Sequence, residues 1–279
     1  MPAEPTAPRS DLRAAVRALL ADADAFGVLG DGANRRPAAD VARASTPARG
    51  FGPAPTAPTA PVPPPHAAAA AATPATSPVA DPATALAGLA CEIDACRRCA
   101  LGGQRTRSVP GQGSPRAELV FVGEAPGADE DREGLAFVGA AGALLTKMIG
   151  AMGLSRDEVF IANVLKCRPP GNREPAPDEV AQCRGYLERQ LAAIRPKVIC
   201  ALGAHAARSL LQTEQSVGKL RGRAHPAFGA QVVATYHPAY LLRTPSEKPK
   251  AWEDLKLVLK LLGREPPARA PAAAPEPVA

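Results

Sequence analysis

Five of the six cysteines in this 279-residue chain lie in polar, basic stretches, where a thiol ionises readily. Cys96 and Cys99 form a C-x2-C pair, and Cys167 and Cys183 enclose a proline-containing segment. Four cysteines without a histidine could hold zinc or an iron–sulfur cluster, or they could be incidental thiols. Cys91 extends the spacing to C-x4-C-x2-C, which resembles the start of a plant-type two-iron ferredoxin site. The spacing alone leaves these alternatives open.

The sixth cysteine has a different setting. Cys200 lies inside the apolar run "KVICALG", and we expect it to be a small core residue. The N-terminal residues lack the charged start and apolar centre of a signal peptide, and no stretch contains 18 strongly apolar residues. We therefore expect a cytoplasmic protein, whose thiols are reduced rather than joined in disulfides.

A second group of chemically capable residues follows the apolar runs. These runs end in the sequences "GEAPG", "NVLKCRPP", "ALGAH" and "HPAYLLR". Gly123 and Gly127 allow the backbone of the first to approach a ligand closely. Asn163 occupies a strand-end position where an apolar residue would be expected, and His237 stands in a His-Pro pair. The chain has neither a GxGxxG nor a P-loop fingerprint, so we expect no dinucleotide or P-loop site.

The elements that must position these residues alternate along the chain. Apolar runs predict strands at 117–127, 159–167, 197–203 and 231–238, and helical patterns fall at 139–152, 178–194, 204–212 and 248–262. This alternation predicts an α/β fold, a three-layer α/β/α sandwich around a central, mostly parallel four-stranded sheet. In such a sheet ligands bind beyond the carboxyl ends of the strands.

Composition divides the chain into four regions. Residues 1–33 include an amphipathic helical pattern, which we expect either to rest on the main domain or to dock a partner. Residues 34–84 are rich in proline and alanine and almost lack bulky apolar residues, so we expect a disordered linker. The compact domain is expected at 85–264, followed by a disordered tail at 265–279.

Five motifs in this order resemble one known family. They are "CRRCAL", "GEAPGADED", "GLAFVGAAGALL", "NVLKCRPPGNREP" and "HPAYLLR". Together they look like the family 4 uracil-DNA glycosylases, the iron–sulfur type of bacteria and archaea, over about residues 86–262. The resemblance implies a uracil-DNA glycosylase-like fold with 85–264 as catalytic domain. It also implies one structural 4Fe-4S cluster, held by Cys96, Cys99, Cys167 and Cys183, with Cys91 outside it.

The resemblance assigns a base pocket to the strand ends. Asn163 would read uracil, because a side-chain amide matches its O4 acceptor and N3-H donor, whereas cytosine reverses that edge. Phe137 would stack on the flipped-out ring. His237 would donate a hydrogen bond to O2, either as neutral imidazole or as a cation. The pocket floor would be formed by Gly123, Glu124, Ala125, Pro126 and Gly127.

The group that activates water is less clearly marked. Glycosylases of the best-known uracil-DNA glycosylase family carry an aspartate where this chain has Ala125. Glu124, Asp129 and Glu130 are the nearby carboxylates, and Glu124 is favoured. The motifs place no lysine as a Schiff-base former, so a monofunctional hydrolase is expected.

A formal net charge of +6 suits a protein that binds phosphates. Tyr240 and Leu241 are expected to enter the vacated base stack, with Arg243 contacting DNA. The basic residues expected near the DNA are Arg97, Arg98, Arg105, Arg107, Lys166, Arg168, Arg173, Arg221, Arg223 and Arg243. The expected partner is uracil-containing DNA, single- or double-stranded, bound by a monomer. A repair partner could bind the N-terminal helix.

Two other functions are considered. A nucleic-acid-binding module that has lost catalysis is disfavoured, because Glu124, Phe137, Asn163 and His237 are all present. The second is a relative that removes other deaminated bases or traps the sugar covalently. The trapping type carries an inserted basic loop ending in histidine after the asparagine motif, and here "CRPPGNREP" follows directly.

Overall fold

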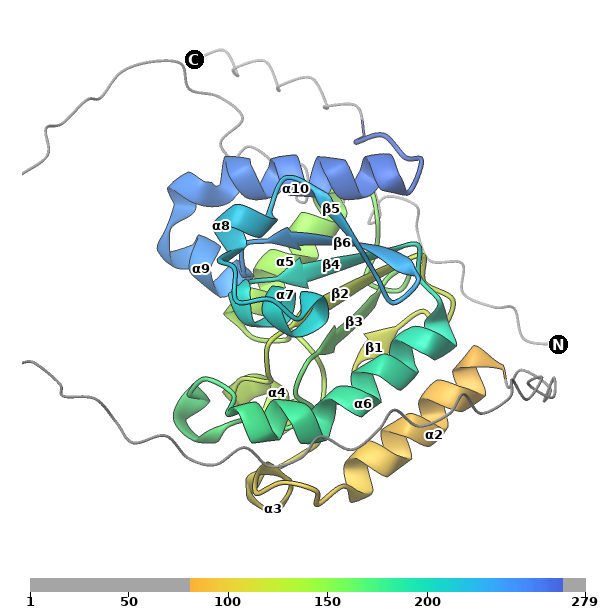
Figure 1. Ribbon diagram of the computed structural model, residues 1–279, viewed down its shortest axis with the longest axis vertical. Coiled ribbons are helices and arrows are strands. Elements are labelled where there is room, and N and C mark those ends of the chain that lie inside the picture. Colours follow the sequence, from red (N-terminus) through yellow and green to blue (C-terminus); the bar gives the residue numbers. More distant parts are fainter. Residues whose placement is uncertain (1–80, 268–279) are drawn as a thin grey trace, which may run out of the picture. The chain divides into compact units, whose positions relative to one another are not determined.

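The computed structural model of the chain describes residues 81–267. The helix predicted within 1–33, nearly all of the 34–84 linker and most of the 265–279 tail lie outside the described residues. The elements in chain order are α2 (Pro82–Ala95), α3 (Leu101–Gln104), β1 (Gln112–Gly113), β2 (Leu119–Gly123), α4 (Ala128–Glu133), α5 (Ala140–Ala151), β3 (Phe160–Asn163), η2 (Pro170–Asn172), α6 (Pro177–Ile194), β4 (Val198–Leu202), α7 (Ala204–Leu211), α8 (Val217–Leu220), β5 (Ala224–Ala227), β6 (Ala230–Thr235), α9 (Pro238–Arg243), η3 (Pro245–Glu247) and α10 (Lys248–Leu261) (Figure 1).

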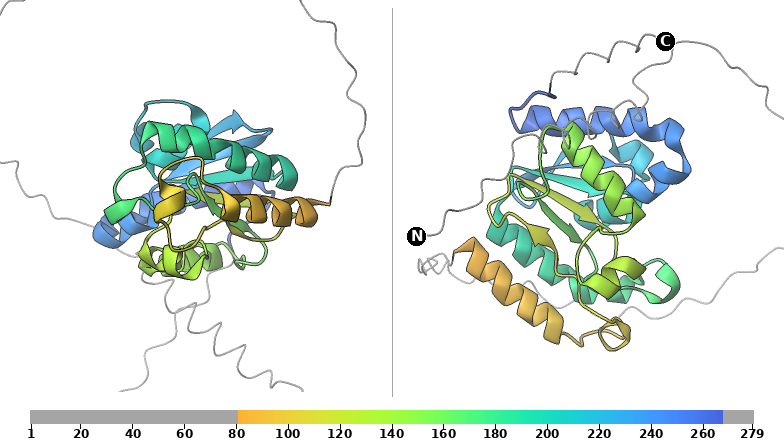
Figure 2. Two further views of the ribbon diagram at one scale, coloured as in Figure 1. Left: turned by 90° about the horizontal axis from the view of Figure 1, so that it is seen from below. Right: turned by 180° about the vertical axis from the view of Figure 1, so that it is seen from behind.

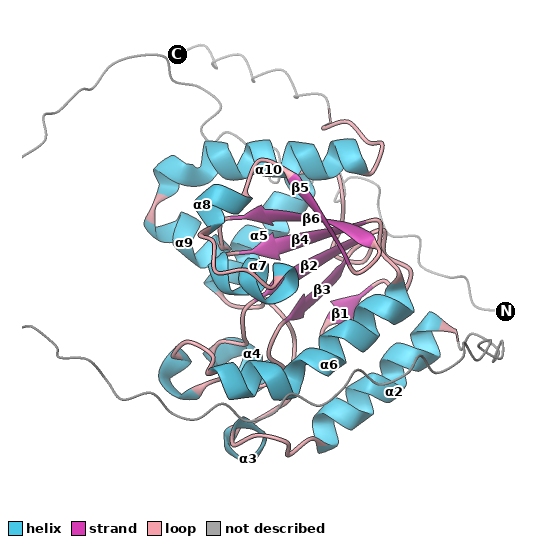
Figure 3. Ribbon diagram, viewed as in Figure 1, coloured by secondary structure: helices cyan, strands magenta, loops and turns pink. Residues whose placement is uncertain are grey.

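The described residues form one sheet with the order β1-β3-β2-β4-β6-β5 (Figure 3). The four predicted strands are the four central ones, and they are parallel. The predicted number of four strands is wrong, because β1 and β5 add an antiparallel strand at each edge. Neither had an apolar signal in the sequence: β1 is only Gln-Gly, and β5 contains Pro226, which a sheet tolerates at its edge.

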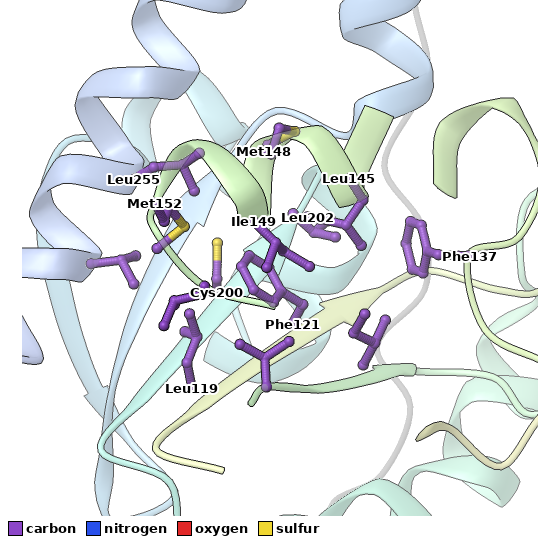
Figure 4. Close-up of a cluster of buried hydrophobic side chains, with 14 of the residues drawn as sticks. Leu119, Phe121, Phe137, Leu145, Met148, Ile149, Met152, Cys200, Leu202 and Leu255 are labelled. Carbon is purple, nitrogen blue, oxygen red and sulfur yellow. The ribbon is translucent and has the colours of Figure 1, made fainter. Parts of the chain in front are cut away.

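Helices cover both faces of the sheet, as a three-layer sandwich requires. One face packs with α5, α9 and α10 around Phe121 and Cys200, and the other packs with α6 and α7 around Val120 and Ile199. Alternate residues of each strand thus face opposite layers. Figure 2 shows the two helical layers on opposite sides of the sheet. Figure 4 shows Phe137 at the edge of the first core, beyond Leu145 and Leu202.

Helix α2 was not predicted as an element. It begins at Pro82, three residues before the expected start of the compact domain, and packs against α6 (Figure 1). Its sequence "PATALAGLACEIDA" has the alanine content of the preceding linker, but alanine is also the strongest helix former. Leu89 and Ile93 supply the buried stripe that the linker lacks. Among the described helices, none is long and apolar enough to cross a membrane.

Candidate active site

The loops after β2 and β3 run side by side beyond the sheet. Gly123 and Asn163 are paired in register at the ends of these strands. The amide of Val164 then donates to the Gly123 carbonyl at 2.9 Å, and the amide of Leu165 donates to the Glu124 carbonyl at 3.0 Å. The parallel hydrogen-bond ladder therefore continues into the loops. The "GEAPG" backbone is held against the segment that leads to Cys167.

Asn163 places an unpaired polar atom inside the protein. The residue is only 1% exposed, and its Oδ1 has no hydrogen-bond partner among the described residues. A Cβ on Gly123 would lie 2.4 Å from this oxygen, so glycine is required opposite it. Buried acceptors are normally satisfied, and leaving one unpaired costs about 1–3 kcal/mol. An orphaned acceptor at a strand end is therefore suited to a ligand's donor.

Phe137 packs closely against two glycines, Gly123 and Gly142. Its ring lies against Gly123, where a Cβ would come within 2.5 Å of the ring edge. Its backbone has a φ of 55°, a left-handed conformation that is costly for an aromatic residue. A Cβ on Gly142, the third residue of α5, would lie 1.9 Å from the Phe137 carbonyl oxygen. The chain therefore presses the Phe137 backbone onto the start of α5 and directs the ring toward the strand ends.

Glu130 is a structural carboxylate of this loop. Its Oε2 accepts from the amide of Gly127 at 3.0 Å, and its Oε1 accepts from the amides of Val138 and Gly139 at 2.9 and 3.1 Å. With three N–H donors, the Glu130 carboxylate joins the loop at Gly127 to the loop at Val138 and Gly139. Asp129, the other alternative base, forms an exposed ion pair with Arg132. Both carboxylates thus already have partners within the protein.

Glu124 is the remaining carboxylate. It is half-buried, and burial raises the pKa of its carboxyl group above the ordinary value. The nearby His205 opposes this shift in pKa, while Glu174 adds to it. His205 Nε2 lies 3.3 Å from Glu174 Oε1. Among the described residues, the Glu124 carboxylate makes no side-chain hydrogen bond, so it is available for a water molecule.

His237 has a defined tautomer. Its Nδ1 accepts a hydrogen bond from the amide of Ala239 at 3.1 Å, which leaves the proton of the neutral ring on Nε2. Burial lowers the pKa of His237 to about 4, and the neighbouring Arg243 guanidinium adds to the shift. Of the two forms considered from the sequence, the neutral one is therefore present at pH 7. The ring centre lies 5.7 Å from that of Phe137.

A third glycine allows His237 to approach. Gly203, which follows β4, has a φ of 90°, and a Cβ there would lie 3.0 Å from the His237 Cβ. The structure thus brings Asn163 and Phe137 together at Gly123, with His237 beside Phe137. The other two residues of the "GEAPG" loop point elsewhere: Pro126 is buried, and Ala125 packs against the cysteine-containing core.

Only one of the two residues predicted to insert into DNA is exposed. Tyr240 is 36% exposed, but Leu241 is fully buried in the core, so its prediction as a surface wedge is wrong. The reason is that residues three apart in a helix share a face, so Pro238 and Leu241 both face the core from α9. Leu242, which the sequence reasoning missed, is 46% exposed, and Arg243 is exposed beside it. No signal in the sequence separates Leu242 from Leu241, because the two are neighbours of the same residue type.

Several basic residues expected near DNA have partners inside the protein. Lys166 is fully buried, so it cannot contact phosphate. Arg221 Nε donates to the buried Asp254 carboxylate at 3.0 Å, and Arg105 Nη1 donates to Cys167 Sγ at 2.9 Å. The sequence alone could not distinguish these buried or paired cations from cations on the surface.

The four cysteines of the predicted cluster line one cavity. The cavity itself is small, with a volume of about 10 Å³, and it is partly open to solvent. Its lining residues are Ile93, Cys96, Arg98, Cys99, Gly102, Arg105, Lys166, Cys167, Gln182, Cys183 and Tyr186. Cys91 is exposed outside this lining, and Cys200 is fully buried in the sheet core, as expected.

The surroundings of these sulfurs favour thiolates in part. Burial opposes ionisation of Cys96, but a hydrogen bond with Tyr186 and the nearby arginines hold its pKa below the ordinary value. Burial raises the pKa of Cys167, against the effect of Arg105, and raises that of Cys183 to about 11. A bound cation is what would keep the last two ionised at neutral pH.

The donor set bears on which metal group the cavity could hold. Four cysteine side chains without a histidine are a donor set for an iron–sulfur cluster or for zinc. Within residues 81–267, no three histidine, cysteine or acidic side chains are arranged to hold a single metal ion. The four cysteines that line the cavity are the ones that the resemblance assigns to the cluster, and their donor set fits it.

The fold and site define a glycosylase. Residues 110–256 match the family model of the uracil DNA glycosylase superfamily. The chain is 47% identical over 184 residues to a type-4 uracil-DNA glycosylase of Archaeoglobus fulgidus, covering 63% of this chain and 92% of the relative. It is 46% identical over 179 residues to the type-4 enzyme of Sulfurisphaera tokodaii, covering 61% and 81%. The chain belongs to the type-4 uracil-DNA glycosylases, hydrolases of N-glycosyl bonds in DNA repair.

A more distant branch of the superfamily is also similar. A type-5 uracil-DNA glycosylase of Pyrobaculum aerophilum is 36% identical over 152 residues, which is 48% of this chain and 67% of the relative. Both the higher identity and the greater coverage thus favour the type-4 family.

Proposed function

We propose that the chain removes uracil from DNA as a monofunctional hydrolase, with the base held between Phe137 and Asn163. The observation that carries this proposal is the unpaired Oδ1 of Asn163. The N3-H of uracil is the donor that this oxygen lacks, and O4 would accept from the amide nitrogen. Cytosine has no hydrogen on N3, so it would leave the oxygen unpaired. The pocket thus favours uracil over cytosine, because binding cytosine would leave the buried Asn163 Oδ1 without a hydrogen bond, and that costs much free energy.

His237 stabilises the leaving group. When the N1–C1′ bond breaks, its electron pair goes to uracil, and negative charge gathers on O2. The Nε2-H of neutral His237 donates to that oxygen. A neutral donor keeps its proton, so uracil departs as an anion stabilised by a hydrogen bond. Donors aimed at developing charge contribute about 10²- to 10³-fold in rate.

Glu124 positions the attacking water. The water adds to C1′, and its proton passes to the Glu124 carboxylate. The raised pKa of this carboxyl group makes it a better proton acceptor. Because no lysine is used as a nucleophile, the product is an abasic site in an unbroken strand.

A 4Fe-4S cluster would be held by Cys96, Cys99, Cys167 and Cys183. When bound, it would supply structural cross-linking between the turn after α2, the loop after β3 and helix α6. Arg105 donates to Cys167 Sγ, one of the sulfurs that would hold it. Ala125 of the "GEAPG" loop packs in the same core as these cysteines, so a cluster there would support the pocket floor.

DNA would bind across α9, through Tyr240, Leu242 and Arg243. Tyr240 and Leu242 are the exposed apolar side chains next to His237, suited to filling the vacated stack. That the enzyme is a cytoplasmic monomer, and that residues 1–33 dock a repair partner, stay predictions from the sequence.

The test uses the purified full chain and a single-stranded oligonucleotide that carries one uracil. Free uracil should be released, and the strand should break only after alkali treatment. Strand breakage without alkali, or a DNA–protein adduct stable in denaturing gels, would contradict the monofunctional reaction. Glu124→Gln should reduce the rate while free uracil still inhibits. If Glu124→Gln lost both excision and inhibition by free uracil, Glu124 would instead be needed for the shape of the pocket.

A further inference from the structure

Lys166 is a buried cation that lines the cysteine cavity, and its ammonium has no role in the function proposed above. It is 1% exposed, and among the described residues no carboxylate pairs with it. Its ammonium donates to the backbone carbonyl of Asn163 at 2.8 Å and to Gln190 Oε1 at 2.7 Å. Burying a lysine is costly compared with an apolar residue of the same length. Two short, charge-assisted hydrogen bonds offset part of this cost.

Gln190 completes a line of contacts across the domain. It lies buried on α6, and its Nε2 donates to the Pro110 carbonyl at 2.7 Å. The backbone of Lys166 is also engaged: its carbonyl accepts from the amide of Val109 at 2.8 Å, and its amide donates to Cys183 Sγ at 3.3 Å. Both ends of Lys166 are therefore fixed. The ammonium points back at the residue that ends β3.

The carbonyl of Asn163 is a sensitive place for such a bond. Asn163 is the last residue of β3, and the peptide that follows it is held at its amide by the bond from Val164 N to the Gly123 carbonyl. A displacement of the Asn163 backbone would move its Cα–Cβ bond and carry the side-chain amide with it. A directional hydrogen bond to the carbonyl of the same peptide adds a second restraint against that displacement. A misplacement of about 1 Å in a catalytic group can cost on the order of 10²-fold in rate.

We propose that Lys166, held by Gln190, is a positioning residue that fixes the Asn163 amide in the uracil pocket. This rests on the proposed role of Asn163 and extends it. The lysine does not touch the base. It acts by holding the Asn163 backbone, and Gln190 acts by holding the lysine.

The experiment compares Lys166→Met, Gln190→Met and Gln190→Glu in the full chain. Methionine at 166 keeps the length and removes the ammonium. Methionine at 190 removes the acceptor for Lys166, and glutamate at 190 keeps it. Both variants lose the donor to the Pro110 carbonyl, so the difference between them reports the bond to Lys166. Single-turnover excision with saturating enzyme gives a rate per bound DNA that does not depend on the fraction of folded enzyme. Inhibition by free uracil reports the pocket directly, and visible absorbance per chain reports the cluster.

Lys166→Met should lower the single-turnover rate by about 10- to 100-fold and weaken free-uracil inhibition to a similar extent. The KM for DNA and the visible absorbance should stay within about twofold of wild type. Gln190→Met should show a smaller loss of the same kind, and Gln190→Glu should lose less than Gln190→Met. If Lys166→Met does not fold, the two Gln190 variants decide the matter.

A wild-type single-turnover rate in Lys166→Met would overturn the proposal. So would a rate loss that follows the loss of visible absorbance, because the lysine would then act through the cluster. Equal losses in Gln190→Met and Gln190→Glu would overturn it as well. Failure of the wild-type chain to release uracil is a separate outcome, which defeats the proposed function rather than the role of Lys166.

Discussion

The carbonyl oxygen of Phe137 rests on Gly142, so close that a Cβ there would lie 1.9 Å from it. Gly142→Ala must therefore push the Phe137 loop away from α5. We expect the free energy of unfolding to fall by at least about 1–3 kcal/mol, as for overpacked cores. Because the Phe137 ring would move with its backbone, uracil excision should fall by more than the folded fraction does. Denaturant titration and single-turnover excision measure the two effects.

Gly185 supplies the matched control. It lies within α6, and a Cβ there would meet nothing within 4 Å. Gly185→Ala should leave excision unchanged and raise the free energy of unfolding by about 0.5–1 kcal/mol, through helix propensity. Equal behaviour of the two variants would mean that Phe137 is not held by Gly142.

Asn163→Asp tests which base the pocket reads. The carboxylate cannot donate to O4 of uracil, but it can accept from the exocyclic amine of cytosine. An unpaired buried group costs about 1–3 kcal/mol, so uracil excision should fall by roughly 5- to 150-fold, and some cytosine excision should appear. Asn163→Ala should lose uracil excision without gaining cytosine excision. Wild-type uracil excision in both variants, with visible absorbance intact, would place the pocket elsewhere.

His237 should make the protein less stable in mild acid. Its pKa is about 4 when folded, below the ordinary 6.5, so the unfolded chain binds a proton that the folded chain does not. The free energy of unfolding should therefore fall as pH drops from about 6.5 to about 4. His237→Gln, which does not titrate, should lack this part of the decline. Urea titrations of both proteins across that range give the difference, and parallel curves would argue against a depressed pKa.

The cysteines should separate into two classes. Cys167→Ser and Cys183→Ser should lose the brown colour of an iron–sulfur cluster together with solubility and excision. Cys91→Ser and Cys200→Ala should keep all three, because one side chain is exposed and the other lies in the sheet core. Iron and zinc analysis of the wild-type protein checks the metal. Colour lost in Cys91→Ser would support a two-iron site, and one zinc per folded chain would exclude the cluster.

Leu241 and Leu242 should respond differently to truncation. Leu241→Ala leaves a cavity in the core and should cost about 2–5 kcal/mol of stability. Leu242→Ala should leave stability nearly unchanged and slow uracil excision from double-stranded DNA more than from single-stranded DNA. The reason is that only a duplex has a base stack to fill. Thermal unfolding and rates on matched single- and double-stranded substrates test this, and equal slowing on both would remove Leu242 from the wedge role.

The central strands and their end residues could be predicted because each carries its own signal in consecutive residues. β2 and β4 are continuous apolar runs, and Gly123 and Asn163 interrupt the pattern at the point where the strands end. The resemblance to a family then connected distant motifs that no local pattern could join. The same reasoning failed for β1, which has two residues and no apolar side chain.

Side-chain direction and the partners of charges could not be read from the sequence. Leu241 and Leu242 are chemically identical neighbours, and only the packing of α9 against α5 decides which is buried. Lys166 resembles a DNA-binding cation in sequence, because its partner Gln190 lies on α6, a helix that follows it in the chain. Glu130 likewise resembles a base until the three amides around it are known.

The packing of α2 on α6 sets the order in which the protein can be completed during synthesis. As the ribosome extends the chain, α2 is the first of the described elements to emerge, with Cys96 and Cys99 following it. Its buried stripe has no surface to cover it until α6, which carries Cys183, has also left the exit tunnel. The face that carries these cysteines is therefore completed late, when α6 packs on α2. Of the four cysteines that line the cavity, a nascent chain that has released only α2 and the turn after it presents two, and only the nearly finished domain presents all four.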